Sequence, residues 1–333
     1  MRRRPRSRHP DGRGGIVEAD RTQIAGLLLA LLAGVFLGSA VAVARFAYDG
    51  GASGIVVAAT RTSMMITAIA IGLLVTRRTF RLPPGLFPLA LLNGVLMTAM
   101  TYGNIGAVEF ISVGLAALLF FTFPILIAVI VTVFRIEPSS PLKLFCIVLA
   151  FVGLAMMLGA SAGDADWRGV AFSLVAAVAT AINAVLVARH FGRVNVFVMT
   201  FHFGWVSLVV MALIGLTLAE VRLPETPGGW GGLFGVALLQ GSAMPMYLYA
   251  ISRIGALKAG MFTNIQPVTS IVEAWALFGE LLGLLQALGG LLVLGSIALM
   301  QWADLRRRRR LTAVPKADQM PPVASLTDGE ETR

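Results

Sequence analysis

Polar side chains form a stripe along the apolar segment 255–278. The spacing i, i+3, i+7, i+10 and i+17 relates Thr263, Gln266, Ser270, Glu273 and Glu280. At 100° per residue, a helix places these positions within one arc of about 100°. Such a face offers hydroxyl, amide and carboxyl groups to a bound molecule, and its carboxyl group can exchange a proton. We therefore interpret the stripe as one wall of a solute-binding site.

Two other segments carry shorter polar faces at helical spacing. Asn93 and Asn104 share a face of 85–106 with Met97 and Met100, while Gln240 and Tyr247 share a face of 230–251 with Met244. An offset of 143 residues maps Asn104 onto Tyr247 and Met97 onto Gln240, so the two faces correspond. These residues are candidate solute contacts. The alternative, which we favour for an isolated Asn or Thr, is a hydrogen bond that ties two helices together for about 0.6 kcal/mol.

The stripe is better explained by a cavity, because its first four positions are not polar in the corresponding segment. The same offset of 143 maps Thr263, Gln266, Ser270 and Glu273 onto the apolar residues Phe120, Phe123, Ile127 and Ile130. A hydrogen bond that the fold requires should recur at both places. A polar wall that faces an apolar one suits an amphipathic solute.

Glu273 is the leading candidate for proton exchange or for binding a cationic solute. An ionised carboxylate inside a bilayer costs several kcal/mol unless it is paired or hydrated. Arg61 and His202 are the basic residues that lie within apolar segments and could pair with it. His202 could also relay a proton, although a structural role is favoured for both residues. The sequence leaves open which of them reaches Glu273.

Pro124 and Pro267 each lie near the middle of an apolar segment. A proline removes one backbone hydrogen bond and kinks the helix. Each is thus a static kink or a hinge that frees a carbonyl to line a site. Separately, the Gly34 to Gly38 spacing permits a close helix contact.

The composition places these residues in a membrane. Of 333 residues, 57% are hydrophobic and 13% are charged, whereas a soluble domain usually has about 25% charged residues. Apolar runs of about 18 residues or more can span a bilayer. Ten such segments are predicted, at 22–44, 53–76, 85–106, 110–134, 142–160, 168–188, 196–219, 230–251, 255–278 and 281–302. The predicted fold is therefore an all-α integral membrane protein with ten transmembrane helices, between disordered basic tails at 1–21 and 303–333.

The distribution of Lys and Arg predicts the orientation. If residue 1 is cytoplasmic, 23 of the 27 basic residues fall in the tails and in cytoplasmic loops, Arg61 lies within a predicted span, and only Arg45, Arg168 and Arg222 fall outside. Cytoplasmic loops carry such an excess, so we expect both termini in the cytoplasm and a location in the cell (inner) membrane. The same distribution argues against nucleic-acid binding despite the net charge of +10.

The sequence contains an internal repeat with the 143-residue offset. It relates Pro124 to Pro267, Glu137 to Glu280, Ala116 to Ala259 and Gly26 to Gly169. The halves, 22–160 and 168–302, hold five predicted spans each. Because five is odd, the second half starts from the opposite side of the membrane, and the repeat is inverted. Inverted repeats are typical of transporters that work by alternating access.

These features together resemble the EamA-type branch of the drug/metabolite transporter superfamily. The resemblance covers both halves and rests on the five-plus-five arrangement and on the repeated spacing from proline to glutamate. The second half keeps Gly279–Glu280 and Gly289, but the first has Arg-Ile-Glu137 and Cys146 instead. The resemblance implies export or exchange of amino acids, metabolites or toxic small molecules by a secondary transporter.

The alternatives are an integral-membrane enzyme or a membrane protein that does not transport. The sequence has no HExxH motif, no GxxxxGK[ST] loop and one cysteine, Cys146, so we expect no metal, no cofactor and no enzymatic activity. The expected partners are a small-molecule solute, the lipid bilayer and, if the transport is proton-coupled, protons; the coupling ion and the oligomeric state are left open.

Overall fold

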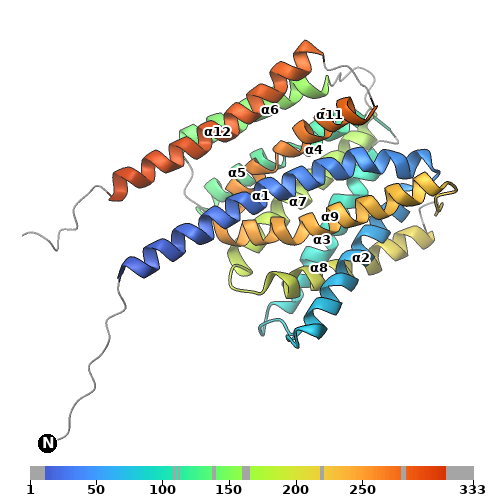
Figure 1. Cartoon of the computed structure of the whole chain (residues 1–333), viewed down its shortest axis with the longest axis horizontal. Helices are drawn as coiled ribbons and strands as arrows, with labels where there is room; N and C mark the ends of the chain where they lie inside the picture. Colours follow the sequence, from blue (N-terminus) through green and yellow to red (C-terminus); the bar gives the residue numbers. More distant parts are fainter. Residues whose placement is uncertain are drawn as a thin grey trace, which may run out of the picture.

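The computed structural model describes residues 12–107, 110–111, 113–136, 140–159, 166–217, 221–278 and 283–312. Within these ranges every regular element is an α-helix (Figure 1). The helices are α1 (Gly12–Asp49), α2 (Gly54–Val75), α3 (Phe87–Ala107), α4 (Val113–Phe120), α5 (Phe123–Val133), α6 (Pro141–Leu158), α7 (Trp167–His190), α8 (Val196–Thr217), α9 (Pro227–Ile254), α10 (Ala256–Phe262), α11 (Ile265–Phe278) and α12 (Leu284–Thr312).

Helices occupy each of the ten predicted segments, two of them as broken pairs. The segment 110–134 is divided into α4 and α5, and 255–278 is divided into α10 and α11. By length and hydropathy, seven described stretches can cross a membrane: 22–49, 54–75, 115–133, 141–158, 167–190, 196–217 and 227–254. Phe87–Gly103 and Leu284–Met300 are shorter apolar helices. The all-helical membrane class is confirmed, while the number of ten crossings stays a prediction.

The first and last helices extend into the tails that the sequence predicts to be disordered. α1 begins at Gly12 and α12 continues to Thr312. The residues 302–312 contain neither Gly nor Pro and are rich in Arg and Leu, which favour helix, so the helix can continue beyond the apolar stretch.

Local sequence signals explain where three helices begin. Ser140 accepts a hydrogen bond from the Lys143 backbone N–H at 3.3 Å, and Pro141 follows it at the first turn of α6. The Asp166 carboxylate caps α7 through the Arg168 N–H, and Thr226 caps α9 through the Gly229 N–H. These side chains satisfy N–H groups that have no partner inside the helix.

The packing of the helices repeats when the two halves are exchanged. α1 packs along α9, and α3 packs along α7. The 143-residue offset turns the first pair into the second, because it maps α1 onto α7 and α3 onto α9. α2 packs on α8 and α6 packs on α12, and because the offset maps α2 onto α8 and α6 onto α12, each of these pairs maps onto itself. The α6–α12 pair lies along one side of the bundle (Figure 1). This is the pattern that a two-fold relation between the halves requires.

Two glycine contacts repeat in the same way. A Cβ atom on Gly26 would lie 2.7 Å from the Ile254 side chain, and one on Gly169 would lie 2.8 Å from that of Ile111. Both the glycines and the isoleucines are 143 residues apart. Each glycine therefore lets a helix of one half approach the other half closely.

We expect Gly169→Val and Gly26→Val to destabilise the protein by similar amounts, about 1–3 kcal/mol each, because each overpacks the same type of contact. Thermal unfolding in detergent measures the effect. Gly295→Val is the control, since no atom lies within 4 Å of a Cβ atom there. A large loss for one glycine and none for the other would contradict the two-fold packing.

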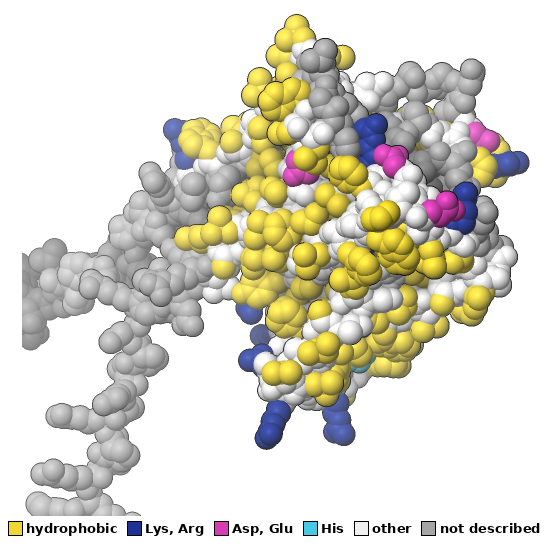
Figure 2. Space-filling view, turned by 45° about the vertical axis from the view of Figure 1, so that its right-hand side comes forward, with side chains coloured by type: hydrophobic (Ala, Val, Ile, Leu, Met, Phe, Trp, Pro, Cys, Tyr) yellow, Lys and Arg dark blue, Asp and Glu magenta, His cyan; other side chains and the backbone are white. Residues whose placement is uncertain are grey.

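The surface is apolar along its middle and charged at its ends. Large exposed side chains such as Leu28, Val41, Val152 and Leu291 form the apolar surface, as a bilayer-facing protein requires (Figure 2). At the lower edge of Figure 2 dark blue side chains project without magenta beside them, whereas both colours are mixed at the upper right.

We call one end of the bundle, where α2, α7 and α9 end, the basic end. Its described charged side chains include Arg78, Arg135, Arg189, Arg253 and Lys258. At the other end lie the connections that carry Asp49, Asp166 and Glu225. Of the carboxylates with described side chains, Glu273 alone lies within a helix away from these ends.

Candidate functional site

The two broken helices have the same construction. Pro124 is the second residue of α5, and Pro267 is the third residue of α11. A proline has no N–H to donate to the carbonyl four residues earlier, so the helix before it ends. Beside each break a threonine hydroxyl donates to the carbonyl three residues back: Thr122 to Leu119 O and Thr263 to Gly260 O, both at 2.7 Å.

The breaks meet each other and α1 in the interior. A Cβ atom on Gly260 in α10 would lie 3.0 Å from Ile127 Cδ1 in α5. Gly34 and Gly38 of α1 press against the start of α11, where a Cβ atom on Gly38 would overlap the Gln266 carbonyl oxygen. The predicted close contact of this glycine pair is thus confirmed, and its partner is the α10–α11 break.

The polar stripe of 255–278 faces α1 in part. The Ser39 hydroxyl of α1 donates to Glu273 Oε1 at 2.5 Å and also lies 3.1 Å from the Val35 carbonyl oxygen. Ser270 donates to the Pro267 carbonyl at 3.0 Å within α11, and Gln266 is half-buried. Glu280 lies outside the described residues. The stripe therefore contributes to a helix contact, and Glu273 is the charged member that the structure describes.

Asn93 has the surroundings of a residue that ties helices together. It is fully buried, donates to the Leu89 carbonyl at 2.7 Å and accepts from the Asn183 amide of α7 at 3.0 Å. Gln240 is half-buried on α9. Asn104 belongs to α3, but its side chain is outside the described part of the structure.

Three buried side-chain polar atoms have no hydrogen-bond partner among the described residues, and one of them is Ser173 Oγ on α7. The other two are the Tyr247 hydroxyl on α9 and Oδ1 of Asn264 at the α10–α11 break; these two residues are 6% and 5% exposed. A buried polar group without a partner costs about 1–3 kcal/mol. Both atoms are therefore available to a ligand, and Asn264 adds a residue that the sequence analysis did not select.

Neither basic candidate pairs with Glu273. Arg61 donates to the Thr101 hydroxyl at 2.6 Å, linking α2 to α3. Nδ1 of His202 lies 2.8 Å from the Val198 carbonyl oxygen, so that nitrogen carries the proton, and the ring meets Phe87 and Phe201 edge-on. Among the described residues no basic side chain lies within ion-pair distance of Glu273. Arg45 and Asp49, which do form an ion pair, lie at the end of α1.

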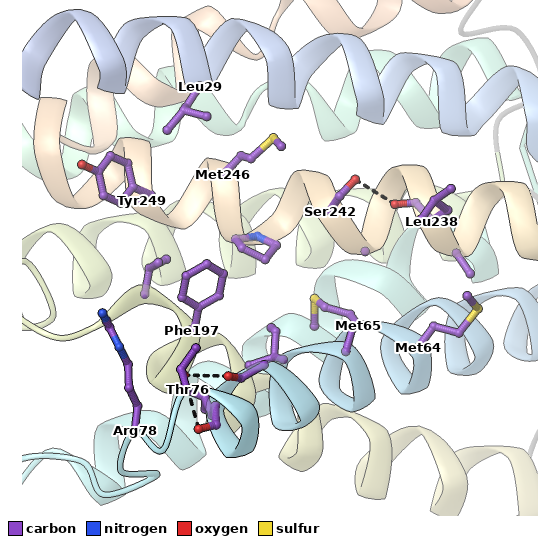
Figure 3. A pocket seen from close by; sticks show the side chains of 18 residues that line it. Leu29, Met64, Met65, Thr76, Arg78, Phe197, Leu238, Ser242, Met246 and Tyr249 are labelled. Carbon is purple, nitrogen blue, oxygen red and sulfur yellow. Dashed lines mark hydrogen bonds between the residues drawn. The ribbon is translucent and has the colours of Figure 1, made fainter.

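A cavity of about 840 Å³ lies between helices of the two halves. Its walls come from α1 and α2 of the first half and from α8 and α9 of the second, and they are mostly apolar. In Figure 3, Tyr249 and Arg78 lie at one end of the cavity, near the basic end, and Leu238 and Met64 lie at the other. Along α9, Tyr249 and Leu238 are about 16 Å apart at 1.5 Å per residue.

The same four helices are joined at the opposite end. The Ser53 N–H donates to the Arg222 carbonyl at 3.0 Å, the Arg222 N–H donates to the Ser53 hydroxyl at 3.1 Å, and the Glu225 N–H donates to the Gly50 carbonyl at 2.7 Å. A Cβ atom on Gly50 would lie 2.5 Å from Gly229 Cα. The helices thus touch at that end and separate toward the basic end.

The sequence analysis did not select this cavity, and none of its predicted stripe residues lines it. Pro245, inside α9, could have indicated the cavity from the sequence. It cannot donate a hydrogen bond to the Gly241 carbonyl, and both residues line the cavity. The Ser242 hydroxyl lies within hydrogen-bonding distance of the Leu238 and Leu239 carbonyls, 2.8 and 2.9 Å away. α9 places these residues on the cavity side and Tyr247 on its buried side.

The apolar belt, the broken helices and the cavity between repeated halves define a multi-pass helical membrane protein. The sequence matches the EamA-like transporter family over residues 24–159 and again over 167–302, so the chain belongs to that family. The family is one of transporters within the drug/metabolite transporter superfamily, not of enzymes.

Solved structures share the fold. One, titled "Crystal structure of protein", has a TM-score of 0.70 and 17% sequence identity, over 84% of this chain and 96% of that one. At that identity the likeness concerns the fold alone. No curated protein matches the sequence.

Proposed function

We propose that the protein is a secondary transporter that exports or exchanges a small organic solute, such as an amino acid or a metabolite. The cavity of about 840 Å³ between α1, α2, α8 and α9 carries the proposal. It lies between the halves, reaches toward the basic end, and stops at Leu238 and Met64, short of the end where loop hydrogen bonds join the same helices. Its apolar wall suits a solute with an apolar body.

Alternating access between two inverted five-helix repeats is the mechanism we propose, with domains at 22–160 and 168–302. The exchange-related packing of α1 on α9 and of α3 on α7 supports it. In this proposal the ten helices cross the inner membrane, Pro124 and Pro267 act as hinges, and the state described here is open toward the basic end.

The polar part of the solute site is proposed behind the cavity wall, on the buried side of α9 and at the α10–α11 break. The unpartnered atoms of Tyr247 and Asn264 support it, together with the half-buried groups of Gln266, Ser270 and Glu273. Glu273 is the proposed proton carrier, because its hydroxyl partner Ser39 can either donate to a carboxylate or accept from a carboxylic acid. His202 is a weaker candidate, since its described contacts are a backbone carbonyl and two phenylalanine rings.

Reconstituted protein tests the function directly. Proteoliposomes are screened against a panel of amino acids and small metabolites, with and without a pH gradient across the bilayer. We expect saturable uptake or counterflow of at least one panel member that protein-free liposomes lack. Uptake equal to that of protein-free liposomes for every member would contradict transport of this class of solute.

We expect a reporter fused after Arg310 to lie in the cytoplasm, because the basic end carries the excess of Lys and Arg. A paired alkaline phosphatase and fluorescent protein fusion measures this, since the first is active only outside the cytoplasm and the second fluoresces within it. Fusions at Gly51, in the connection from α1 to α2, are the matched control and should give the reverse result. Phosphatase activity at Arg310 would overturn both the orientation and the even number of crossings.

A further inference from the structure

A second cavity, of about 680 Å³, lies at the basic end and is lined by both halves. Arg135 follows α5 of the first half, whereas Arg189 lies in the last turn of α7 and Lys258 belongs to α10 of the second half. Three cationic side chains from three separate segments thus line one cavity. No described residue that lines it carries a carboxylate.

The fold does not require these three charges. The offset of 143 maps Arg135 onto Phe278, Arg189 onto Phe46 and Lys258 onto Leu115, all of them apolar. If the cations served the helix packing, polar groups should occur at both places. The charges are confined to one end of the molecule instead.

Arg135 occupies a backbone position that glycine favours. Its φ is +50°, and it lies two residues beyond the end of α5. This conformation lets the Ile136 N–H donate to the Val131 carbonyl at 2.9 Å. A helix that ends in this way usually has glycine at the left-handed residue, because a side chain there costs about 1 kcal/mol or more. Arg77 has the same backbone conformation after α2, so glycine can replace either arginine without strain.

One flank of the cavity continues onto the lipid-facing surface. Phe134 lines the cavity and is 67% exposed, and Val129 and Val133 extend this exposed apolar strip along α5. A small inorganic anion gains no binding free energy from an apolar strip, whereas an acyl chain can pack against it. The cavity therefore offers cations to a headgroup and an apolar track to a lipid tail.

We propose that this cavity binds the headgroup of an anionic phospholipid, with Arg135, Arg189 and Lys258 around its phosphate. Basic cavities between helices at the cytoplasmic side of a membrane suit such headgroups, and the proposed orientation places the basic end there. Since α5 belongs to one half and α7, α9 and α10 belong to the other, the bound lipid bridges the two halves. The binding itself does not depend on the transport function.

Native mass spectrometry of the purified, delipidated full chain tests the site. The protein in neutral detergent is titrated with phosphatidylglycerol or with phosphatidylcholine. We expect the wild-type chain to bind phosphatidylglycerol at least about tenfold more tightly. The double variant Arg135→Gly/Arg189→Gln should lose this preference, because each cation near an anionic lipid contributes a factor of about five.

The matched control is Arg77→Gly/Arg81→Gln. It removes the same charge at the same end, and Arg77 has the same φ of +50°, but neither residue lines the cavity. Glycine suits both left-handed positions, so both variants should fold. We expect the control to keep the preference for phosphatidylglycerol.

Three results would overturn the proposal. One is equal binding of the two lipids by the wild-type chain, and another is an equal loss of preference in both double variants, which would indicate overall charge alone. The third is full displacement of phosphatidylglycerol by about 1 mM inorganic phosphate, which would assign the cavity to a free anion rather than to a lipid.

Discussion

Glu273→Gln is expected to reduce accumulation driven by a pH gradient at least tenfold while leaving solute exchange near the wild-type rate. The carboxyl group is the one described acidic side chain within a helix away from the ends, and it lies against the Ser39 hydroxyl of α1. Glutamine keeps the shape and can still accept the hydrogen bond from Ser39. It cannot carry a proton at neutral pH, so only steps that need a titrating group should fail.

The geometry of Ser39 explains how a proton could be coupled to movement. Its hydroxyl has one hydrogen and two acceptors in reach, Glu273 Oε1 at 2.5 Å and the Val35 carbonyl at 3.1 Å. With an ionised Glu273 the hydrogen goes to the carboxylate. With a protonated Glu273 the carboxyl group can donate to Ser39, whose hydrogen then turns to Val35. The link between α1 and α11 thus differs between the two protonation states.

Proteoliposomes loaded with a pH-sensitive dye measure proton movement when a solute from the panel is added. Glu225→Gln is the control, because this carboxylate is exposed in the connection between α8 and α9. Unchanged accumulation in Glu273→Gln would return the residue to a structural role. Accumulation that persists with weaker solute binding would instead assign Glu273 to a cationic group of the solute.

The fold follows closely from the sequence because a bilayer leaves few options. Backbone groups in lipid must be paired within the segment, so each long apolar run had to be a helix. The offset that relates Pro124 to Pro267 also located both helix breaks, since proline acts through the local backbone. Gly26 and Gly169 could be paired by the offset, but the isoleucines that each contacts became known only from the packing.

The site was less predictable because residue spacing defines the face of a helix but not whether that face contacts another helix, a cavity or lipid. The stripe through Ser270 and Glu273 suggests a cavity wall, yet Gly38 brings α1 directly against part of it. Asn93 and Tyr247 were both selected from helical spacing alone; the first is paired with Asn183, while the hydroxyl of the second has no described partner. Apolar residues such as Leu238 and Met246 carry no signal that separates a cavity wall from a lipid-facing surface.

Gly241→Met is expected to lower the transport rate at least about fivefold with little loss of stability. Gly241 lines the cavity between α2 and α9, where a Cβ atom would lie 3.4 Å from Met65 Cβ. That spacing is ordinary contact, so the first carbon fits, and the longer side chain must extend into the cavity. A solute that binds in this space then has to displace the methionine side chain or overlap with it. An overpacking cost of about 1–3 kcal/mol corresponds to a loss of roughly 5- to 150-fold in solute affinity.

Gly231→Met on the same helix is the matched control for this variant. No atom lies within 4 Å of a Cβ atom at Gly231, and the residue is exposed, so the longer side chain meets neither the cavity nor a neighbouring helix. Both variants remove a glycine from α9, which should stabilise that helix slightly and equally. Transport at the wild-type rate by Gly241→Met, with unfolding temperatures that match in the two variants, would show that the solute takes another path. A loss shared by both variants would trace the effect to the helix and not to the space beside Met65.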